Sequence, residues 1–356
     1  MRIAILDDYQ NATAGIPAVA ELRRLGEVLV YHTKARTEAE LVERLRGVEI
    51  VIPIRERTAL PDRVLAQLPD LRYICQTGDR APVIDVEAAT RCGMLVTSTP
   101  YPEPSGSATA ELTVGLMIAV MRQIGAEDRA MRAGKWQTTI GVGLEGKTLG
   151  LLGLGRVGAR VCGLARAFGM RVLAWGFTLS PERAESAGAG MVPRETLLHE
   201  ADVVSVHLRL TPESRGSIGR TQLALMKPTA YLINTSRGPI VDEAALVEVL
   251  RERRIAGAGL DVFGEEPTHP DNPLCMLDNV VLTPHLGFVT EETYQVVFQG
   301  VLENVRTYLS GRPSRVLNPE VLRATVVRRA AVFQQLEGGR RTADRCLGGM
   351  APGVEP

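Results

Sequence analysis

Hydrophobic and polar positions alternate along the chain in two ways, which predicts short strands separated by amphipathic helices. Short runs of mostly β-branched apolar residues predict strands, whereas apolar residues spaced three or four apart predict helices. In the first hundred residues the predicted strands are Ile3–Leu6, Val28–Tyr31, Ile50–Ile54, Tyr73–Gln76 and Leu95–Val96. The predicted helices are Ile16–Leu25, Glu38–Leu45 and Val86–Arg91. This alternation is typical of a parallel sheet covered by helices, so it predicts one doubly wound α/β unit.

A second series of strands follows a long helical stretch, which is predicted from Ser107 to about Ala133. Ser107 followed by Glu111 is typical of a helix start, because a hydroxyl and an early carboxylate can satisfy free N–H groups. The predicted strands of this series are Thr148–Leu152, Arg171–Trp175, Val203–Val206, Ala230–Asn234, Ala258–Val262 and Val280–Thr283. Six strands with helical spacers predict a complete sheet of the dinucleotide-binding type.

The C-terminal part of the chain changes in composition. A helix is predicted for Glu291–Leu309, but beyond about Ala324 the chain is rich in Arg, Gly and Ala and has no clear core-facing pattern after Gln335. Residues 337–356 are therefore predicted to form a disordered tail. A terminal helix involved in oligomer contacts is the alternative.

Length and charge exclude several classes of protein. The 356 residues suggest two domains, and 41 Lys and Arg balance 41 Asp and Glu, which argues against a nucleic-acid partner. The longest apolar run, Val114–Met121, is much shorter than the ~18 residues that a membrane span needs. The N-terminus also lacks a secretory cleavage pattern. We therefore expect a cytoplasmic protein with no membrane partner.

The cysteines give no sign of a metal or redox site. Their number is odd, they are widely scattered, and no CxxC pair occurs. Buried thiols in a reducing cytoplasm are expected, and no metal site is predicted. The five residues are Cys75, Cys92, Cys162, Cys275 and Cys346.

A glycine-rich turn lies between the strand Thr148–Leu152 and the next predicted helix. It contains Gly153, Gly155 and Gly158 in the pattern GxGxxG. The pattern alone is weak evidence, but its place between a strand and a helix is typical of a site that binds a dinucleotide pyrophosphate. In such sites the three glycines allow a tight turn, close approach of the pyrophosphate and close packing of helix on strand. Free N–H groups and the helix dipole then face the phosphates.

The next strand lacks the acid that usually follows such a turn. An Asp or Glu about 20 residues on would bind the ribose hydroxyls of NAD and repel the extra phosphate of NADP. Residues 176–180, which follow the strand Arg171–Trp175, contain no carboxylate. Thr178, Ser180 and Arg183 could form a positive phosphate clamp instead, so both NAD and NADP stay open.

The glycine-rich turn and three further segments together resemble the D-2-hydroxyacid dehydrogenase family, which includes phosphoglycerate dehydrogenase, D-lactate dehydrogenase and the glyoxylate/hydroxypyruvate reductases. Their order and separation also fit, and the resemblance covers roughly residues 45–320. The segments are Gly153–Gly158, Leu225–Gly238, Gly259–Pro267 and Thr283–Gly287.

The resemblance implies three catalytic residues for hydride transfer between NAD(P) and a 2-oxo or D-2-hydroxy acid. Arg237 would bind the substrate carboxylate, often in a bidentate manner. His285 would act as acid/base at the carbonyl oxygen, and Glu266 would pair with the imidazole and favour its protonated form. Read alone, each is most simply a surface or loop residue, but all three follow strands of a nucleotide-binding sheet, where ligands bind.

The resemblance also implies cofactor and substrate contacts. Gly176 occupies the position where relatives usually carry the ribose-binding acid, and His207 would lie beside the cofactor without a catalytic role. The expected cofactor contacts are Gly153, Gly155, Arg156, Val157, Gly158, Gly176, Leu208, Thr235, Ser236, Asp261, Gly287 and Thr109. The expected substrate contacts are Thr77, Gly78 and Asp79 in a loop that would cradle the carboxylate, with Arg237, while Arg55 and Arg57 could bind a second acidic group.

The domain organisation that follows is α/β with two doubly wound domains and a cleft between them. A flavodoxin-like substrate domain would comprise residues 1–104 and 291–325, and a Rossmann NAD(P)-binding domain would comprise residues 105–290. By the same resemblance, the helical stretch Ser107–Ala133 is expected to contribute to a homodimer.

Other functions stay open. Phosphite dehydrogenase shares the three catalytic residue types, so a phosphite substrate is an alternative. Formate dehydrogenases lack the counterpart of Glu266 and fit less well. The C-terminal-binding-protein corepressors keep this fold and these residues but act by docking peptides, so a binding protein is a third alternative. The identity of the 2-hydroxy acid cannot be read from the sequence.

Overall fold

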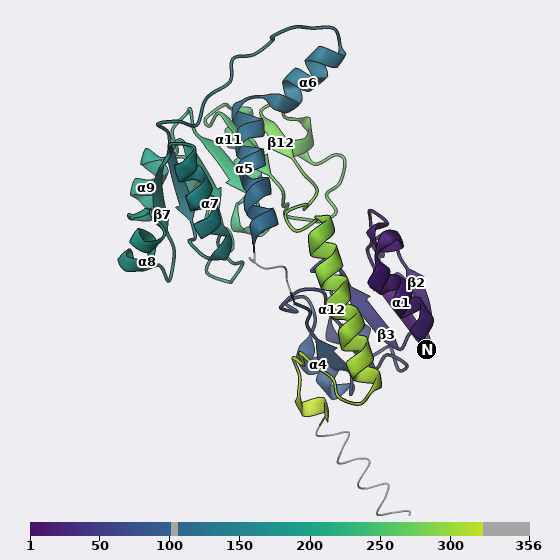
Figure 1. Cartoon of the computed structure of the whole chain (residues 1–356). Helices are drawn as coiled ribbons and strands as arrows, with labels where there is room; N and C mark the ends of the chain where they lie inside the picture. The colour runs from purple at the N-terminus through teal and green to yellow at the C-terminus, as the bar shows by residue number, and fades with distance from the viewer. Residues whose placement is uncertain (101–105, 323–356) are drawn as a thin grey trace, which may run out of the picture. The chain divides into compact units, whose positions relative to one another are not determined.

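The computed structural model describes residues 1–100 and 106–322 (Figure 1). The predicted disordered tail and Cys346 lie outside the described residues. Contacts divide the chain into two compact units, one formed by Met1–Tyr101 with Tyr294–Pro356 and the other by Pro102–Thr293. Each unit is built on its own parallel sheet.

The sheet of the first unit has the strand order β2-β1-β3-β4-β5, which is the flavodoxin-like order. Its strands are β1 Arg2–Leu6, β2 Glu27–Val30, β3 Ile50–Pro53, β4 Tyr73–Cys75 and β5 Leu95–Thr97. β1 lies between β2 and β3, with Ile3 opposite both Val28 and Ile50, and it is almost entirely buried. All five predicted strands are present, and only their ends differ.

Helices cover this sheet and start where the sequence supplies caps. The Thr37 side chain accepts a hydrogen bond from Glu40 N (3.1 Å), and Asp85 accepts one from Ala88 N (2.8 Å), so α2 and α4 begin at the next residues. The four-residue α3 was not predicted, because one turn carries no readable periodicity. The helices are η1 Ala12–Gly15, α1 Pro17–Leu25, α2 Glu38–Arg44, α3 Asp62–Leu65, α4 Val86–Arg91 and α12 Glu291–Leu309.

The long C-terminal helix α12 packs into the first unit. Phe298, Val301 and Val305 are buried, and the ring of Tyr308 stacks on Tyr73 with centroids 4.5 Å apart. The chain thus returns to the first unit after completing the second.

The sheet of the second unit has seven strands in the order β12-β11-β10-β9-β6-β7-β8, all parallel. The expectation of six strands was wrong, because β8 is a two-residue exposed edge strand that leaves no pattern in the sequence. The order reverses between β6 and β9, so ligands are expected at the carboxyl ends of these strands. The strands are β6 Thr148–Leu152, β7 Arg171–Trp175, β8 Gly190–Met191, β9 Val203–Val206, β10 Tyr231–Asn234, β11 Gly257–Leu260 and β12 Val280–Leu282.

Helices pack on both faces of this sheet and bury two hydrophobic clusters. One cluster joins α5 and α7 to the sheet, and the other joins α9, α10 and α11 to it. The helices are α5 Ser107–Met121, α6 Ile124–Arg132, α7 Arg156–Ala167, α8 Pro181–Ser186, α9 Arg194–Glu200, α10 Arg220–Leu223, η2 Gly238–Ile240, α11 Glu243–Arg251 and η3 Pro273–Met276.

The expected long helix from Ser107 is broken in two. Gln123 adopts a left-handed conformation (φ 57°) between α5 and α6, and α6 stands away from the sheet before a long returning loop (Figure 1). The helix start also differs from the expectation. Gly106 occupies the N-cap position with φ 88°, and the Ser107 hydroxyl donates to the Glu111 carboxylate (2.9 Å) instead of capping a free N–H.

The expectation that the cysteines are buried holds only in part. Cys75 and Cys162 are buried, whereas Cys92 and Cys275 are exposed. Cys92 follows α4 directly and Cys275 lies in the short helix η3, so both are in surface segments.

Candidate active site

The glycine-rich turn joins β6 to α7, and its three glycines face different surroundings. Gly153 has φ 101°, and a Cβ there would overlap the backbone of His207; a Cβ on Gly158 would overlap the Gly153 carbonyl. These two glycines therefore allow backbone segments to pack together. A Cβ on Gly155 would meet nothing within 4 Å, so this glycine faces open space at the start of α7.

The end of β7 lies beside this turn. Gly153 N donates to Trp175 O (2.7 Å), and a Cβ on Gly176 would lie 3.8 Å from the Gly153 Cα, an ordinary contact. Arg156 and Val157 form the first turn of α7, and Arg156 is exposed. The predicted ribose position therefore adjoins the predicted pyrophosphate position.

A chain of threonine hydroxyls links α5 to two of the site loops. Thr109 donates to Gly287 O (2.8 Å), while Thr113 donates to Thr109 O (2.7 Å) and also lies 2.7 Å from the Thr235 hydroxyl. Because the single Thr113 proton is used on Thr109 O, Thr235 donates to Thr113. Ser236 donates a hydrogen bond to Leu208 O and extends this hydrogen-bonded group.

His285 and Glu266 form a close pair. His285 Nδ1 lies 2.6 Å from Glu266 Oε2, and both side chains are about one third exposed, 29% and 34%. Glu266 Oε1 accepts from Phe263 N (3.0 Å), which fixes the carboxylate on its other side. Burial raises the pKa of Glu266, but hydrogen bonding and the charge of His285 outweigh it. The Phe263 N–H and the Arg237 charge add to this effect, so the pKa is lowered from its ordinary value.

A carboxylate with a lowered pKa is ionised at neutral pH and can only accept hydrogen bonds. The proton between the two residues therefore belongs to His285 Nδ1, and Nε2 is left to exchange a proton with a substrate. The His285 and Phe288 rings also meet in an edge-to-face arrangement, with centroids 5.9 Å apart.

Arg237 lies near Glu266 because the loops that carry the two residues pack closely together. It follows β10, and its side chain donates to Ser236 O (2.7 Å). A Cβ on Gly238 would overlap the backbone of Phe263, so only glycine lets the Arg237 loop pack against the loop that carries Glu266. Sequence reasoning did not identify Gly238 as a site residue, although it directly follows the arginine.

Asp261 holds the turn that carries His285. Its carboxylate accepts from the Thr283 hydroxyl (2.6 Å), Leu286 N (2.7 Å) and Gly287 N (2.8 Å), and its carbonyl accepts from His285 N (2.8 Å). Burial raises the pKa of Asp261, and these hydrogen bonds only partly offset the increase. Three hydrogen bonds within the protein thus engage the carboxylate, and its expected contact with the cofactor stays a prediction.

His207, next to the turn, is a neutral imidazole. Its Nε2 lies 2.9 Å from the Ser205 hydroxyl, and burial lowers its pKa to about 4. An uncharged imidazole at this position is better suited to packing beside a cofactor than to transferring a proton.

The substrate residues expected in the first unit form a separate group. Thr77 accepts from Arg55 N (2.6 Å) and donates to Pro53 O (2.9 Å), while Gly78 N donates to Thr99 Oγ1 (2.7 Å). Thr77 N also donates to Pro53 O (3.3 Å), so the N–H groups of Thr77 and Gly78 are used within the protein.

Arg55 and its neighbours determine the surface of this group. The Arg55 side chain covers Gly78, where a Cβ would overlap the guanidinium, and Asp79 is exposed. Arg57 donates to Asp7 O (2.6 Å) and lies over the ring of Tyr9, 4.6 Å from its centroid. Arg57 is thus engaged by the loop after β1, which reduces its suitability for a second acidic group.

The structure brings together Arg237, Glu266 and His285, and near them Thr109, Thr235, Asp261 and Gly287. The residues of the first unit lie together at the carboxyl ends of β3 and β4. That the two groups face each other across a cleft stays a prediction.

The glycine-rich turn fits a dinucleotide. Open space in front of Gly155 lets a pyrophosphate approach the backbone at the start of α7, and neutral His207 and Leu208 lie alongside. Among the described residues no cluster of His, Cys, Asp or Glu could hold a metal ion. None of the helices in residues 1–100 and 106–322 combines the length and apolar character needed to cross a bilayer.

Comparisons with known proteins agree with this geometry. Residues 114–287 match the family model for the NAD-binding domain of D-isomer specific 2-hydroxyacid dehydrogenases. A glyoxylate reductase of Aeropyrum pernix is 43% identical over 280 residues, which cover 75% of this chain and 83% of that protein. A D-3-phosphoglycerate dehydrogenase of Methanocaldococcus jannaschii is 40% identical over 297 residues, 83% of this chain and 56% of that protein.

A solved structure is similar over most of its length. The phosphoglycerate oxidoreductase of Vibrio cholerae O395 has a TM-score of 0.83 and 37% identity, covering 87% of this chain and 99% of that chain. The predicted fold class, α/β with two doubly wound domains, is confirmed. The chain is therefore an enzyme that belongs to the D-isomer specific 2-hydroxyacid dehydrogenase family and uses NAD or NADP.

Proposed function

We propose that this enzyme interconverts a 2-oxo acid and a D-2-hydroxy acid, with His285 as the acid/base, Glu266 as its partner and Arg237 as the carboxylate-binding residue. The observation that carries this assignment is the 2.6 Å contact between His285 Nδ1 and Glu266 Oε2, in a place where the Arg237 charge also acts on Glu266.

The division of labour follows from the chemistry of carbonyl reduction. A bound NADH or NADPH supplies the hydride to the carbonyl carbon. His285 then gives its Nε2 proton to the carbonyl oxygen, where negative charge develops, and takes the proton back in the oxidation. Ionised Glu266 stabilises the imidazolium and fixes its orientation. The planar Arg237 guanidinium holds the substrate carboxylate through two parallel hydrogen bonds.

A small 2-oxo acid such as glyoxylate or hydroxypyruvate is the substrate class we propose first. Relatives named as glyoxylate reductase support it, whereas relatives named as D-3-phosphoglycerate dehydrogenase support a phosphorylated substrate. The engagement of Arg57 by Asp7 and Tyr9 favours the smaller substrates, because it leaves less cationic surface for a second anionic group.

The direct test follows the absorbance of reduced nicotinamide with purified protein. NADH and NADPH are each tested with glyoxylate, hydroxypyruvate, pyruvate, 2-oxoglutarate and 3-phosphohydroxypyruvate, and consumption with any of them is expected. Silence across this panel with intact cofactor binding would contradict the proposal and direct the search to phosphite or to peptide docking.

Replacing the acid/base tests the residue assignment. His285→Ala is expected to reduce turnover about 10²-fold or more and to leave cofactor binding nearly unchanged, since only proton transfer is lost. His199→Ala, at an exposed position of α9, is the matched control and should retain full activity. Equal turnover in the two variants would remove His285 from the mechanism.

We also propose that the enzyme is a homodimer formed through α5, α6 and the segment after them. α6 has no buried residue, and Met131, Trp136 and Ile140 are 62%, 73% and 96% exposed. These side chains lie on α6 and on the segment that follows it to Ile140, which we call the exposed arm. Large apolar side chains gathered on such an exposed segment are typical of a protein interface.

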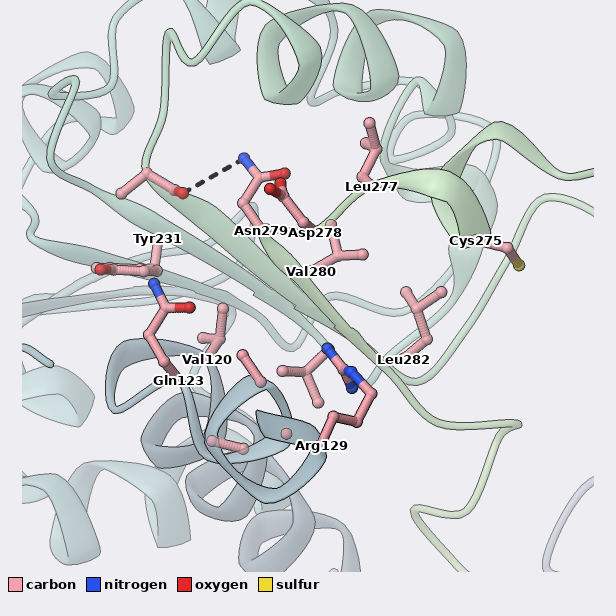
Figure 2. Close-up of a pocket in the computed structure, with 15 residues that line it drawn as sticks. Val120, Gln123, Arg129, Tyr231, Cys275, Leu277, Asp278, Asn279, Val280 and Leu282 are labelled. Atoms are coloured by element: carbon pink, nitrogen blue, oxygen red, sulfur yellow. Dashed lines mark hydrogen bonds between the residues drawn. The ribbon is translucent and has the colours of Figure 1, made fainter. Parts of the chain in front are cut away.

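A cavity of about 510 Å³ lies beside this arm, between α5, α6 and the segment that includes β12. Figure 2 shows Gln123 and Arg129 on its helix side and Tyr231 and Val280 on its strand side. Asn279, which donates to Ala256 O (3.3 Å), also lines it. The cavity gives the same surface a recess large enough for an aromatic side chain of a second copy.

A further inference from the structure

Arg183 links the two loops that flank the predicted ribose position. Its Nη1 donates to Thr178 O (3.0 Å), in the loop after β7, and its Nη2 donates to Leu154 O (3.4 Å), inside the glycine-rich turn. The side chain comes from the short helix α8 and reaches back over both loops. A cationic group therefore lies between the predicted pyrophosphate and ribose positions.

This positive charge is not neutralised by the protein. Within the described part of the chain Arg183 forms no ion pair, and both of its partners are neutral carbonyls. Two contacts use two of the five N–H donors of a guanidinium, and the side chain is exposed. It can therefore meet an anionic ligand with charge-assisted hydrogen bonds.

The segment directly after β7 contains no acid that would oppose an additional phosphate. Gly176 stands where a ribose-binding carboxylate would follow β7, and residues 176–180 contain neither Asp nor Glu. A Cβ on Gly176 would lie 3.5 Å from Leu179 Cβ and 3.8 Å from Gly153 Cα. Residue 176 thus faces the turn without close overlap, and its lack of a side chain removes the usual discrimination against NADP.

We propose that Arg183 binds the 2′-phosphate of NADPH and makes this enzyme prefer NADPH to NADH. The inference rests on the proposed function only in that the cofactor is a nicotinamide dinucleotide. Arg183 would act as a specificity residue, since the 2′-phosphate belongs to the adenosine half of the cofactor and not to the nicotinamide ring that transfers the hydride. Its guanidinium would bind the phosphate oxygens either in place of the Thr178 and Leu154 carbonyls or together with them.

Binding of two nucleotide fragments separates this inference from catalysis. We expect 2′,5′-ADP to bind the wild-type enzyme about 10-fold or more tightly than 5′-AMP in calorimetry, because the additional phosphate gains charge-assisted hydrogen bonds. Arg183→Gln should remove this difference while leaving 5′-AMP binding unchanged, and Arg183→Lys should keep part of it.

Arg251→Gln is the matched control. Arg251 is exposed in the last turn of α11, at the end opposite the site, so the variant loses the same charge on the same unit. It should bind both fragments like the wild type. A melting curve confirms that each variant is folded, and the exposure of both arginines makes this the expected result.

Gly176→Asp provides a second, independent variant. The new carboxylate would repel the 2′-phosphate and bind the ribose hydroxyls, so 2′,5′-ADP affinity should fall and NADH turnover should rise relative to NADPH turnover. Equal affinities of wild type for the two fragments, no binding of 2′,5′-ADP, or unchanged affinities in Arg183→Gln would each overturn the inference.

The two proposals fail in different ways. Arg183-dependent 2′,5′-ADP binding with no turnover of any 2-oxo acid would contradict the proposed function and support this inference. Turnover with NADH alone, together with equal binding of the two fragments, would support the proposed function and contradict this inference.

Discussion

His207 is held uncharged by its surroundings, and this has a measurable effect on stability in mild acid. Burial lowers the pKa of its imidazole to about 4, against about 6.5 in an unfolded chain. Between these pH values the unfolded state binds a proton that the folded state does not, so the free energy of unfolding falls as the pH falls through this window.

We therefore expect His207 to cost about 2 kcal/mol of stability between pH 7 and pH 5. His207→Gln removes the titrating group, so the variant should lose less stability than the wild type over this range. Urea unfolding at the two pH values, without cofactor, measures the difference. Parallel losses in the two proteins would show that His207 is accessible to protons in the folded state.

At the scale of residues, the sequence indicated candidate residues better than the contacts that hold them. The motifs and the family resemblance indicated Arg237, Glu266 and His285, which the fold brings together, and their catalytic roles stay a prediction. They did not reveal that Asp261 holds the His285 turn through three side-chain hydrogen bonds, or that Gly238 must lack a side chain. These roles depend on segments that are distant in sequence and meet only in the fold.

Among the elements, α12 depends on one buried polar side chain. Asn304 is fully buried, donates to Ser98 O (2.7 Å) and accepts from Arg315 (2.9 Å) and Ser314 (3.1 Å). It thereby joins the helix to the end of β5 and to the segment that follows the helix. A buried amide with such contacts is costly to remove, because its partners lose their hydrogen bonds.

Asn304→Leu is expected to lower the free energy of unfolding by about 2–4 kcal/mol, since it leaves buried polar partners unsatisfied. Gln299→Leu, the same type of change at an exposed position of α12, should alter it by less than about 0.5 kcal/mol. Denaturant unfolding of both variants checks the prediction. Similar losses would mean that the helix, and not its buried amide, limits stability.

The sequence pattern predicted the elements with a long periodicity, and it missed features that extend over only one or two residues. The buried strands of both sheets were found from apolar runs alone, with ends within one or two residues. The break at Gln123 was missed because a left-handed conformation at a non-glycine residue has no local signature. Strand β8 was missed because two exposed residues show no alternation.

At the scale of the whole molecule, both units place their candidate site residues at the carboxyl ends of parallel strands. In the second unit the glycine-rich turn follows β6, Arg237 follows β10 and His285 follows β12. In the first unit Arg55 follows β3 and Gly78 follows β4. Two sheets of the same construction can thus divide cofactor and substrate binding between them.

The proposed dimer is tested at the exposed arm. Trp136→Glu and Ile140→Glu should each shift the enzyme toward monomer, because a charge at an apolar interface is not compensated. Leu309→Glu, at a 49% exposed position of the first unit, is the control and should keep the wild-type mass. Light scattering after size-exclusion chromatography measures it. A monomeric wild-type enzyme at micromolar concentration would refute the dimer.

The different surroundings of the turn glycines also affect how this protein can evolve. Side chains at Gly153 and Gly158 would disturb the packing of the backbone, so folding itself restricts these positions. Gly155 faces open space, and its φ of −86° is available to any residue, so the fold leaves it unrestricted and only the predicted pyrophosphate contact would restrict it. A descendant with a larger residue there would lose the cofactor and keep its fold. One mutation could thus start the conversion of a dehydrogenase into a protein that keeps the fold and binds other molecules without catalysing hydride transfer.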